Sequence, residues 1–187
     1  VRMYTCGPTV YDYAHIGNFR AFVFEDLLRR FLEFKGFNVK HVMNLTDVDD
    51  KTIAGANRNV GAIHESPLQR LQKFTEIYTR AFHEDLKTLN ILPPNYPAEQ
   101  PRATREIHAM LDLIEELIKK GVAYESDGSI YYRVSAFPGY GKLSKKKLDG
   151  NIKGARVDVD EYDKEEGADF VLWKKAKEGE PSWDSSW

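Results

Sequence analysis

Hydrophobic positions near the start of the chain follow two different periods. Val1–Cys6 is a short apolar run that is typical of a buried strand. After a loop over Gly7–Gly17, apolar residues recur at helical spacing from Phe19 to Lys35, with charged residues between them. A second run over Asn38–Leu45, rich in Val and Met, predicts another strand.

The order strand, helix, strand is that of a βαβ unit, which predicts two parallel strands joined by a right-handed crossover. Asn18 is the predicted N-cap of the helix, and Gly36 is the predicted C′ residue beyond its end. Ligands of such sheets bind outside the carboxyl ends of the strands. We therefore expect Cys6–Thr9 and Asn44–Asp47 to lie together at that edge.

The remaining hydrophobic pattern predicts an α+β block. Helices are expected from Val48 or Asp49 to Asn57, from Ser66 and Pro67 to Leu86, and from Ala103 to Ile118, the last ended by Gly121. Strands are expected at Ala123–Glu125, Ile130–Val134 and Phe170–Trp173, the first two forming a hairpin around Ser126–Ser129. Residues 57–65, 92–101 and 135–169 are expected to be irregular. Because the character changes near Thr46–Asp50, we place a domain boundary there, dividing the chain into 1–46 and 47–187.

Composition narrows the class of protein. The chain has 187 residues, of which 42% are hydrophobic and 30% charged, as in a globular protein. A net charge of -2 provides no overall basic field, so nucleic-acid binding would need a local patch. One cysteine excludes an internal disulfide and suits a reducing compartment. The sequence shows no signal-peptide pattern and no apolar run long enough to span a bilayer. The first residue, Val1, is not Met, and we expect a fragment of a longer protein.

The loop before the first helix is the main candidate for phosphate binding. Strand, small-residue loop and helix bring backbone N–H groups and a helix N-terminus together, which favours an anion. The loop has neither the Walker nor the G-x-G-x-x-G pattern. His15-Ile16-Gly17 instead fits a site where a histidine donates to phosphate oxygens and Gly17 leaves room for a nucleotide. A histidine that merely caps the helix remains the alternative.

Two further candidate sites each have a functional and a purely structural interpretation. Cys6 is either a zinc ligand, which needs three partners, or a small buried hydrophobic residue. The segment Thr46-Asp47-Val48-Asp49-Asp50 is either a metal or substrate-amine site, or a helix start with carboxylates in its first turn. The helix-start reading is stronger for Asp49 and Asp50 than for Thr46 and Asp47.

Taken together, the motifs resemble the cysteinyl-tRNA synthetase family, of the class I aminoacyl-tRNA synthetases. They are Cys6-Gly7-Pro8-Thr9-Val10-Tyr11-Asp12, His15-Ile16-Gly17-Asn18 and Asn44-Leu45-Thr46-Asp47-Val48-Asp49-Asp50-Lys51. Further agreement extends to Gly179-Glu180-Pro181-Ser182-Trp183, so the resemblance covers nearly the whole chain.

The resemblance implies an α/β fold with a Rossmann-like, HUP-type parallel sheet, an α+β insertion, and a catalytic domain that is incomplete at its C-terminus. Residues 1–46 would be the first half of the nucleotide-binding domain, and 47–187 the connecting helices and the insertion. The implied reaction activates cysteine with ATP and passes it to tRNA(Cys). Implied partners are cysteine, ATP with Mg²⁺ and tRNA(Cys), for a cytoplasmic monomer without a membrane.

The resemblance also assigns site residues. His15 and Asn18 would be catalytic, and ATP would contact Pro8, Thr9, His15, Ile16, Gly17 and Asn18. The substrate would contact Gly7, Thr9 and Thr46. Cys6 would be the first ligand of a zinc ion that binds the substrate thiol, because a soft cation prefers thiolate to hydroxyl.

Three departures from the family pattern matter. Asn18 stands where the class has a second histidine, and its amide can still donate to a phosphate or ribose oxygen. The other three zinc ligands and the second, lysine-rich signature are absent; the basic run from Lys142 to Lys146 imitates that signature only superficially. We therefore expect the fragment alone to be inactive. Two alternatives stay open: a cysteine–amino-sugar ligase of the same superfamily, and a non-catalytic truncated module.

Overall fold

The computed structural model describes residues 1–58, 65–97, 100–145 and 169–187. Contacts divide the chain into two compact units, one formed by Val1–Ile107 with Glu178–Ser182 and the other by His108–Lys177 with Trp183–Trp187. Most of the predicted irregular segments over 57–65 and 135–169 lie outside the described residues. Among the described helices, none combines the length and the apolar character that crossing a bilayer requires.

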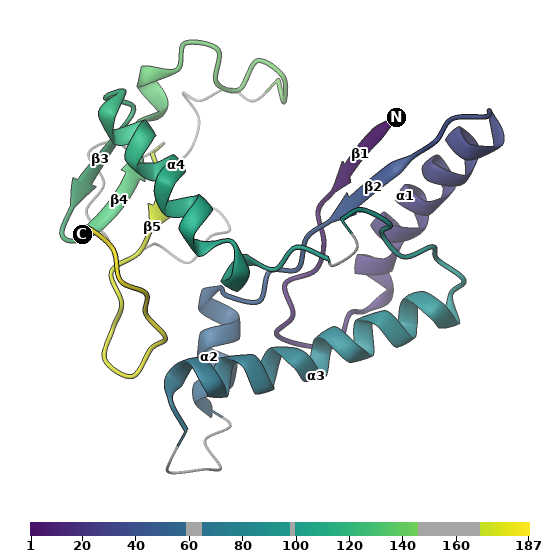
Figure 1. Cartoon of the computed structure of the whole chain (residues 1–187), viewed down its shortest axis with the longest axis horizontal. Helices are drawn as coiled ribbons and strands as arrows, with labels where there is room; N and C mark the ends of the chain where they lie inside the picture. The colour runs from purple at the N-terminus through teal and green to yellow at the C-terminus, as the bar shows by residue number, and fades with distance from the viewer. Residues whose placement is uncertain (59–64, 98–99, 146–168) are drawn as a thin grey trace. The chain divides into compact units, whose positions relative to one another are not determined.

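The first unit begins with the predicted βαβ arrangement. Strand β1 (Arg2–Thr5) pairs in parallel with β2 (Lys40–Met43), in a register that runs from Arg2 opposite Lys40 to Thr5 opposite Met43. Helix α1 (Ile16–Phe34) connects the two strands and lies beside them (Figure 1). The parallel pair is thus confirmed, with β2 shorter than the predicted strand over Asn38–Leu45.

Helix α1 ends as predicted but begins earlier. Gly36 has a φ of 86°, the left-handed conformation expected of a C′ residue. The N-cap, however, is His15 and not Asn18. His15 Nδ1 accepts the backbone N–H of Gly17, while Asn18 Oδ1 accepts the backbone N–H of His15. The prediction was wrong because this reciprocal box can use a histidine ring in place of the usual hydroxyl.

Two helices follow β2. Helix α2 (Asp50–Arg58) and helix α3 (Pro67–Thr88) agree closely with the predicted segments, and Ser66 caps α3 with Pro67 in its first turn. They pack so tightly that a Cβ on Gly55 would lie 2.2 Å from the Phe74 ring. The core of this unit joins α1, β2 and α3; its buried members are Val10, Phe19, Phe22, Met43, Leu45, Phe82, Leu86 and Ile91.

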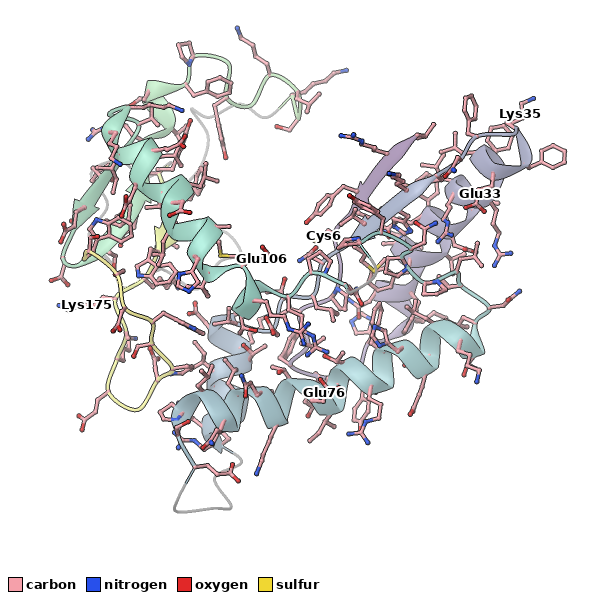
Figure 2. All side chains as sticks on the ribbon, viewed as in Figure 1. Cys6, Glu33, Lys35, Glu76, Glu106 and Lys175 are labelled. Atoms are coloured by element: carbon pink, nitrogen blue, oxygen red, sulfur yellow. The ribbon has the colours of Figure 1, made fainter. Side chains whose placement is uncertain are left out.

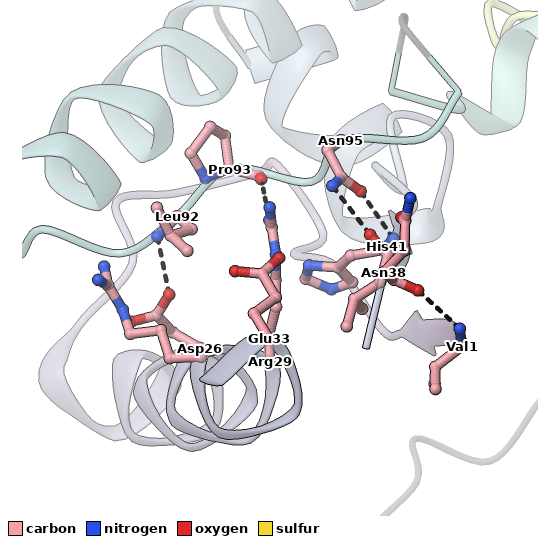
Figure 3. A network of polar contacts seen from close by, with 11 residues as sticks. Val1, Asp26, Arg29, Glu33, Asn38, His41, Leu92, Pro93 and Asn95 are labelled. Carbon is pink, nitrogen blue, oxygen red and sulfur yellow. Dashed lines mark hydrogen bonds and ion pairs between the residues drawn. The ribbon is translucent and has the colours of Figure 1, made fainter. Parts of the chain in front are cut away.

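The connection after α3 is bound to the sheet through polar contacts (Figure 3). Asn95 Oδ1 accepts the N–H of His41 at 2.8 Å, and Asn95 Nδ2 donates to the carbonyl of Val39 at 3.0 Å. On the α1 side, the buried Arg29 donates to the carbonyl of Pro93 at 2.6 Å. The two bonds of Asn95 satisfy backbone groups along the side of β2 that does not pair with β1.

The predicted helix from Ala103 is broken into two pieces. A 3₁₀ turn η1 (Ala103–Arg105) is followed by α4 (Ile107–Lys119), and Gly121 ends the helix with a φ of 71°. The break coincides with a side-chain contact from far away in the sequence. Asp47 Oδ1 and Oδ2 accept the N–H and the hydroxyl of Thr104 at 2.9 and 2.6 Å. Helical periodicity could not reveal this contact.

The second unit packs α4 on a three-stranded antiparallel sheet. Strands β3 (Ala123–Ser126), β4 (Ser129–Tyr132) and β5 (Phe170–Trp173) lie in that order. Asp127 and Gly128 have φ values of 46° and 74°, as a two-residue hairpin turn requires. The predicted hairpin and the predicted last strand are therefore confirmed.

Candidate active site

The two segments predicted to meet at the carboxyl edge of the sheet do so. Beyond β1 and β2, Thr9 and Thr46 form an isolated parallel bridge. Thr46 donates its N–H to the carbonyl of Pro8 at 3.0 Å, and Val10 donates its N–H to the carbonyl of Thr46 at 3.1 Å. Backbone pairing thus brings Pro8, Thr9 and Thr46 together, while Cys6 follows directly after β1 (Figure 2).

Gly7 is placed against β2 at very short range. Its N–H donates to Asn44 Oδ1 at 3.0 Å, and a Cβ built on Gly7 would lie 1.6 Å from the carbonyl oxygen of Asn44. Only glycine can occupy this position without moving the backbone, because other Cβ atoms do not approach a carbonyl so closely. The segment that follows Cys6 is therefore fixed to the end of β2.

His15, Ile16, Gly17 and Asn18 form the exposed N-terminus of α1. The His15 ring packs directly on Gly17, where a Cβ would lie 2.8 Å from ring atom Cε1. Because Nδ1 of a neutral ring accepts the Gly17 N–H, the proton must sit on Nε2. The capping role and a donor role of His15 are therefore compatible, since they use different nitrogens.

The loop between Gly7 and His15 is held in place by contacts of two tyrosines, Tyr11 and Tyr13. Lys51 Nζ lies 4.8 Å from the centre of the Tyr11 ring, a cation–π contact between the loop and α2. Tyr13 packs edge-on against Tyr78 of α3, with ring centres 5.2 Å apart. The sequence alone does not indicate these partners, because both lie more than one element away along the chain.

Cys6 is an exposed free thiol whose Sγ lies 3.6 Å from the carbonyl of Gly7. The alternative reading of Cys6 as a small buried hydrophobic residue is thus contradicted, and an accessible sulfur suits a soft cation such as zinc. Across the ranges described, however, no three potential ligands of the His, Cys, Asp or Glu type come together. Cys6 alone fits one position of a zinc site, and the described residues do not complete it.

The acidic segment after β2 has structural roles. Asp47 is only 4% exposed and uses both oxygens on Thr104. Asp49 Oδ1 accepts the N–H of Lys51 at 2.9 Å, as a residue before a helix does. Asp50 lies in the first turn of α2, where a carboxylate favours the helix dipole. This geometry supports the helix-start reading for Asp49 and Asp50.

A buried histidine contacts Thr5, the residue before Cys6. Thr5 Oγ1 is in hydrogen-bond contact with His41 Nε2 at 2.9 Å, and His41 is 2% exposed. Burial lowers the pKa of His41, and the positive charge of Arg29 lowers it further, against the opposing charges of Asp26 and Glu33. Burial also raises the pKa of Glu25, which a hydrogen bond to Thr5 partly offsets. The lowered pKa of His41 favours its neutral form in the sheet.

Asn44 is the residue of this site whose role sequence reasoning missed. Its side chain contacts Gly7, Tyr4 and Thr46, at 3.0, 3.0 and 3.2 Å. The sequence placed Asn44 at the expected sheet edge as the first residue of Asn44–Asp47, but nothing in the sequence indicates the partners of its side chain.

Comparison with known proteins assigns the family. The family model described as "tRNA synthetases class I (C) catalytic domain" matches residues 1–187. A cysteine–tRNA ligase of Solibacter usitatus is 55% identical over 186 residues, which cover 100% of this chain and 38% of that protein. Enzymes of the same name from Brachyspira hyodysenteriae and Chlamydia trachomatis serovar D are 53% and 50% identical, each over 99% of this chain.

The chain thus spans 37–38% of the length of these relatives. The strand–loop–helix with His15 at its helix start, and the juxtaposed ends of β1 and β2, lie within the matched residues. This chain belongs to the family of class I tRNA synthetase catalytic domains.

Proposed function

We propose that the complete protein is a cysteine–tRNA ligase and that this chain supplies part of its catalytic domain. The observation that carries the proposal is the identity of 50–55% to cysteine–tRNA ligases over essentially the whole chain. The parallel pair of strands with a helix between them supports the further proposal of a Rossmann-like, HUP-type sheet. On this view residues 1–46 are its first half.

The nucleotide would bind at the start of α1. His15 presents Nε2–H away from its capping bond, so that it can donate to a phosphate oxygen of ATP while Nδ1 holds the helix. The dipole at this terminus also favours negative charge. Pro8, Thr9, Ile16, Gly17 and Asn18 would line the same site. Asn18 uses Oδ1 in the capping box, which leaves its Nδ2–H as a donor.

The amino acid would bind at the sheet edge beside Gly7, Thr9 and Thr46. In the reaction, its carboxylate attacks the α-phosphate of ATP and displaces pyrophosphate, which leaves cysteinyl-adenylate. A hydroxyl of the terminal adenosine of tRNA(Cys) then takes the cysteinyl group, and AMP is released. The residues named here would act by binding and orientation, which bring the reacting groups together. ATP would enter with Mg²⁺, and the complete enzyme would act as a cytoplasmic monomer.

A zinc ion at Cys6 would complete the recognition of the substrate thiol. When bound there, zinc would favour a thiolate over the hydroxyl of serine. The three remaining ligands would come from residues other than those described. Replacing Cys6 with Ser in the complete enzyme should lower the zinc content and raise the KM for cysteine much more than the KM for ATP. Unchanged zinc stoichiometry would contradict the ligand assignment.

The proposed function is tested by cysteine-dependent exchange of pyrophosphate into ATP, followed by charging of tRNA(Cys), with the complete protein. Serine in place of cysteine is the matched control and should support neither reaction. Coupling of cysteine to an amino-sugar without charging of tRNA would instead identify the amino-sugar ligase. Loss of both reactions would favour a non-catalytic module.

A further inference from the structure

We propose that Asn44 is a positioning residue that connects the segment after Cys6 to the hydroxyl of Thr46 and fixes the direction in which that hydroxyl donates. The inference rests on the proposed function, because it concerns how the amino-acid site is held. It is carried by three side-chain hydrogen bonds of one amide, which link both strands at the sheet edge.

The orientation of the Asn44 amide follows from its partners. The N–H of Gly7 can only donate, so the side-chain atom 3.0 Å away must be the oxygen, Oδ1. The hydroxyl of Tyr4 donates to the same oxygen at 3.0 Å. Two donors thus occupy the two lone pairs of Oδ1, and Nδ2 must face the other way.

Nδ2 of Asn44 donates to Thr46 Oγ1 at 3.2 Å. The Thr46 oxygen is therefore an acceptor toward Asn44, and its own proton is free to turn toward the edge of the sheet. A carboxylate or carbonyl oxygen of a bound amino acid could then accept a hydrogen bond from the Thr46 hydroxyl. Asn44 thus sets the polarity of the hydroxyl as well as its place.

The backbone does not need this side chain in order to pair. Thr46 and Pro8 are joined by a backbone hydrogen bond of 3.0 Å, and Val10 and Thr46 by another of 3.1 Å. The Asn44 side chain is also partly exposed, so burial is not its main contribution. Its three hydrogen bonds orient groups that the backbone pairing does not orient, above all the hydroxyl of Thr46. Asn44 is therefore a positioning residue.

The decisive variant is Asn44→Asp in the complete enzyme. The new carboxylate keeps the acceptor for Gly7 and Tyr4 but places an acceptor where Nδ2 was. Thr46 must then donate to residue 44, and its proton is no longer available to the substrate. We expect the KM for cysteine to rise about tenfold, which is the size of one hydrogen bond, while the KM for ATP stays within about twofold. Asn38→Asp, the same change at an exposed asparagine outside the site, is the matched control and should change neither KM.

A double-mutant cycle with Thr46→Val separates positioning from general stability. If Asn44 acts through the Thr46 hydroxyl, Asn44→Asp should add less than about twofold to the KM for cysteine once that hydroxyl is gone. Equal effects of Asn44→Asp on both KM values and on kcat, or full additivity with Thr46→Val, would overturn the inference. A wild-type enzyme without cysteine-dependent pyrophosphate exchange would overturn the proposed function, and this inference with it.

Discussion

At the scale of single residues, the candidate site depends on contacts between atoms that cannot be read from the sequence. Gly7 matters because it has no Cβ, and Asn44 because its amide has a donor and an acceptor in fixed positions. His15 combines the cap of α1 with a free Nε2–H. In each case the residue type could be noted from the sequence, but the reason for it lies in a neighbour.

Replacing Gly7 with Ala should destabilise the first unit. The added Cβ would lie 1.6 Å from the Asn44 carbonyl oxygen, so the end of β1 must move away from β2. We expect the free energy of unfolding to fall by about 1–3 kcal/mol, as for overpacked sites, measured by urea denaturation. Gly139→Ala is the matched control, because its Cβ would meet only the exposed ring of Phe137, at 3.3 Å. An equal loss in both variants would contradict the steric argument.

Stability should also depend on pH through His41. Its pKa in the fold is lowered from about 6.5, so below that pH the unfolded chain binds a proton that the folded chain does not. The contribution of neutral His41 is complete above pH about 6.5 and is lost as the pH falls toward the lower, folded pKa. The urea midpoint of the wild type should therefore fall more steeply between pH 7.5 and pH 5.5 than that of His41→Gln. Parallel curves would exclude His41 as the cause.

At the scale of elements, contacts that are distant in sequence override local pattern. The amphipathic stretch from Ala103 predicted one helix, yet Asp47 holds Thr104 in a 3₁₀ turn before α4 begins. The same contact holds η1 close to the segment that follows β2. Leu45 and Arg102 form a parallel bridge there, so the segment before η1 runs beside the end of β2.

Replacing Asp47 with Ala should release this turn. The partly buried N–H and hydroxyl of Thr104 would lose both acceptors, and we expect a loss of about 1–3 kcal/mol in the free energy of unfolding. Amide hydrogen exchange at Thr104 should accelerate locally. Thr104→Ser keeps the hydroxyl and should retain most of the stability, whereas Thr104→Val should not. Unchanged exchange at residue 104 in Asp47→Ala would contradict the proposed cause of the helix break.

At the scale of the whole molecule, the chain consists of two compact units with separate cores. The first unit contains all the candidate site residues. In the second unit, Ile130 of β4 is fully buried in a cluster with Ile114 of α4 and Ala123 of β3. The functional boundary predicted at residue 46 remains a prediction, since compactness does not identify which residues bind the nucleotide.

Truncating Ile130 to Ala should therefore act within one unit. Removing a fully buried Ile costs about 2–5 kcal/mol through lost burial and the cavity left behind. Hydrogen exchange should accelerate in α4 and β3–β5 but stay unchanged in β1, β2 and α1. Phe82→Ala is the reciprocal control for the first core, where Phe82 packs on Phe22 with ring centres 5.1 Å apart. Equal acceleration throughout the chain would show that the units unfold together.

Local patterns predicted the elements of this molecule well, and long-range contacts account for most of what they missed. The parallel pair, α2, α3 and the hairpin followed from period, capping residues and turn residues, which act within a few positions. The split before α4 and the role of Asn44 depend on partners that only the folded chain brings close. The cap by His15 is a local contact, and the N-cap was misplaced because a histidine ring takes the place of the usual hydroxyl. The meeting of Cys6–Thr9 with Asn44–Asp47 could be predicted because parallel topology alone implies it.

The close approach of Gly7 to Asn44 has a consequence for alignment of the strands. A parallel pair with only four matched residues on each strand has little side-chain pattern to choose its register. A slip of β1 by one position would put Cys6 or Pro8 against the Asn44 carbonyl, and each carries the Cβ that this space excludes. The lack of a Cβ at Gly7 therefore permits only one register of β1 against β2. Through that alignment it determines where the sulfur of Cys6 stands relative to Thr46.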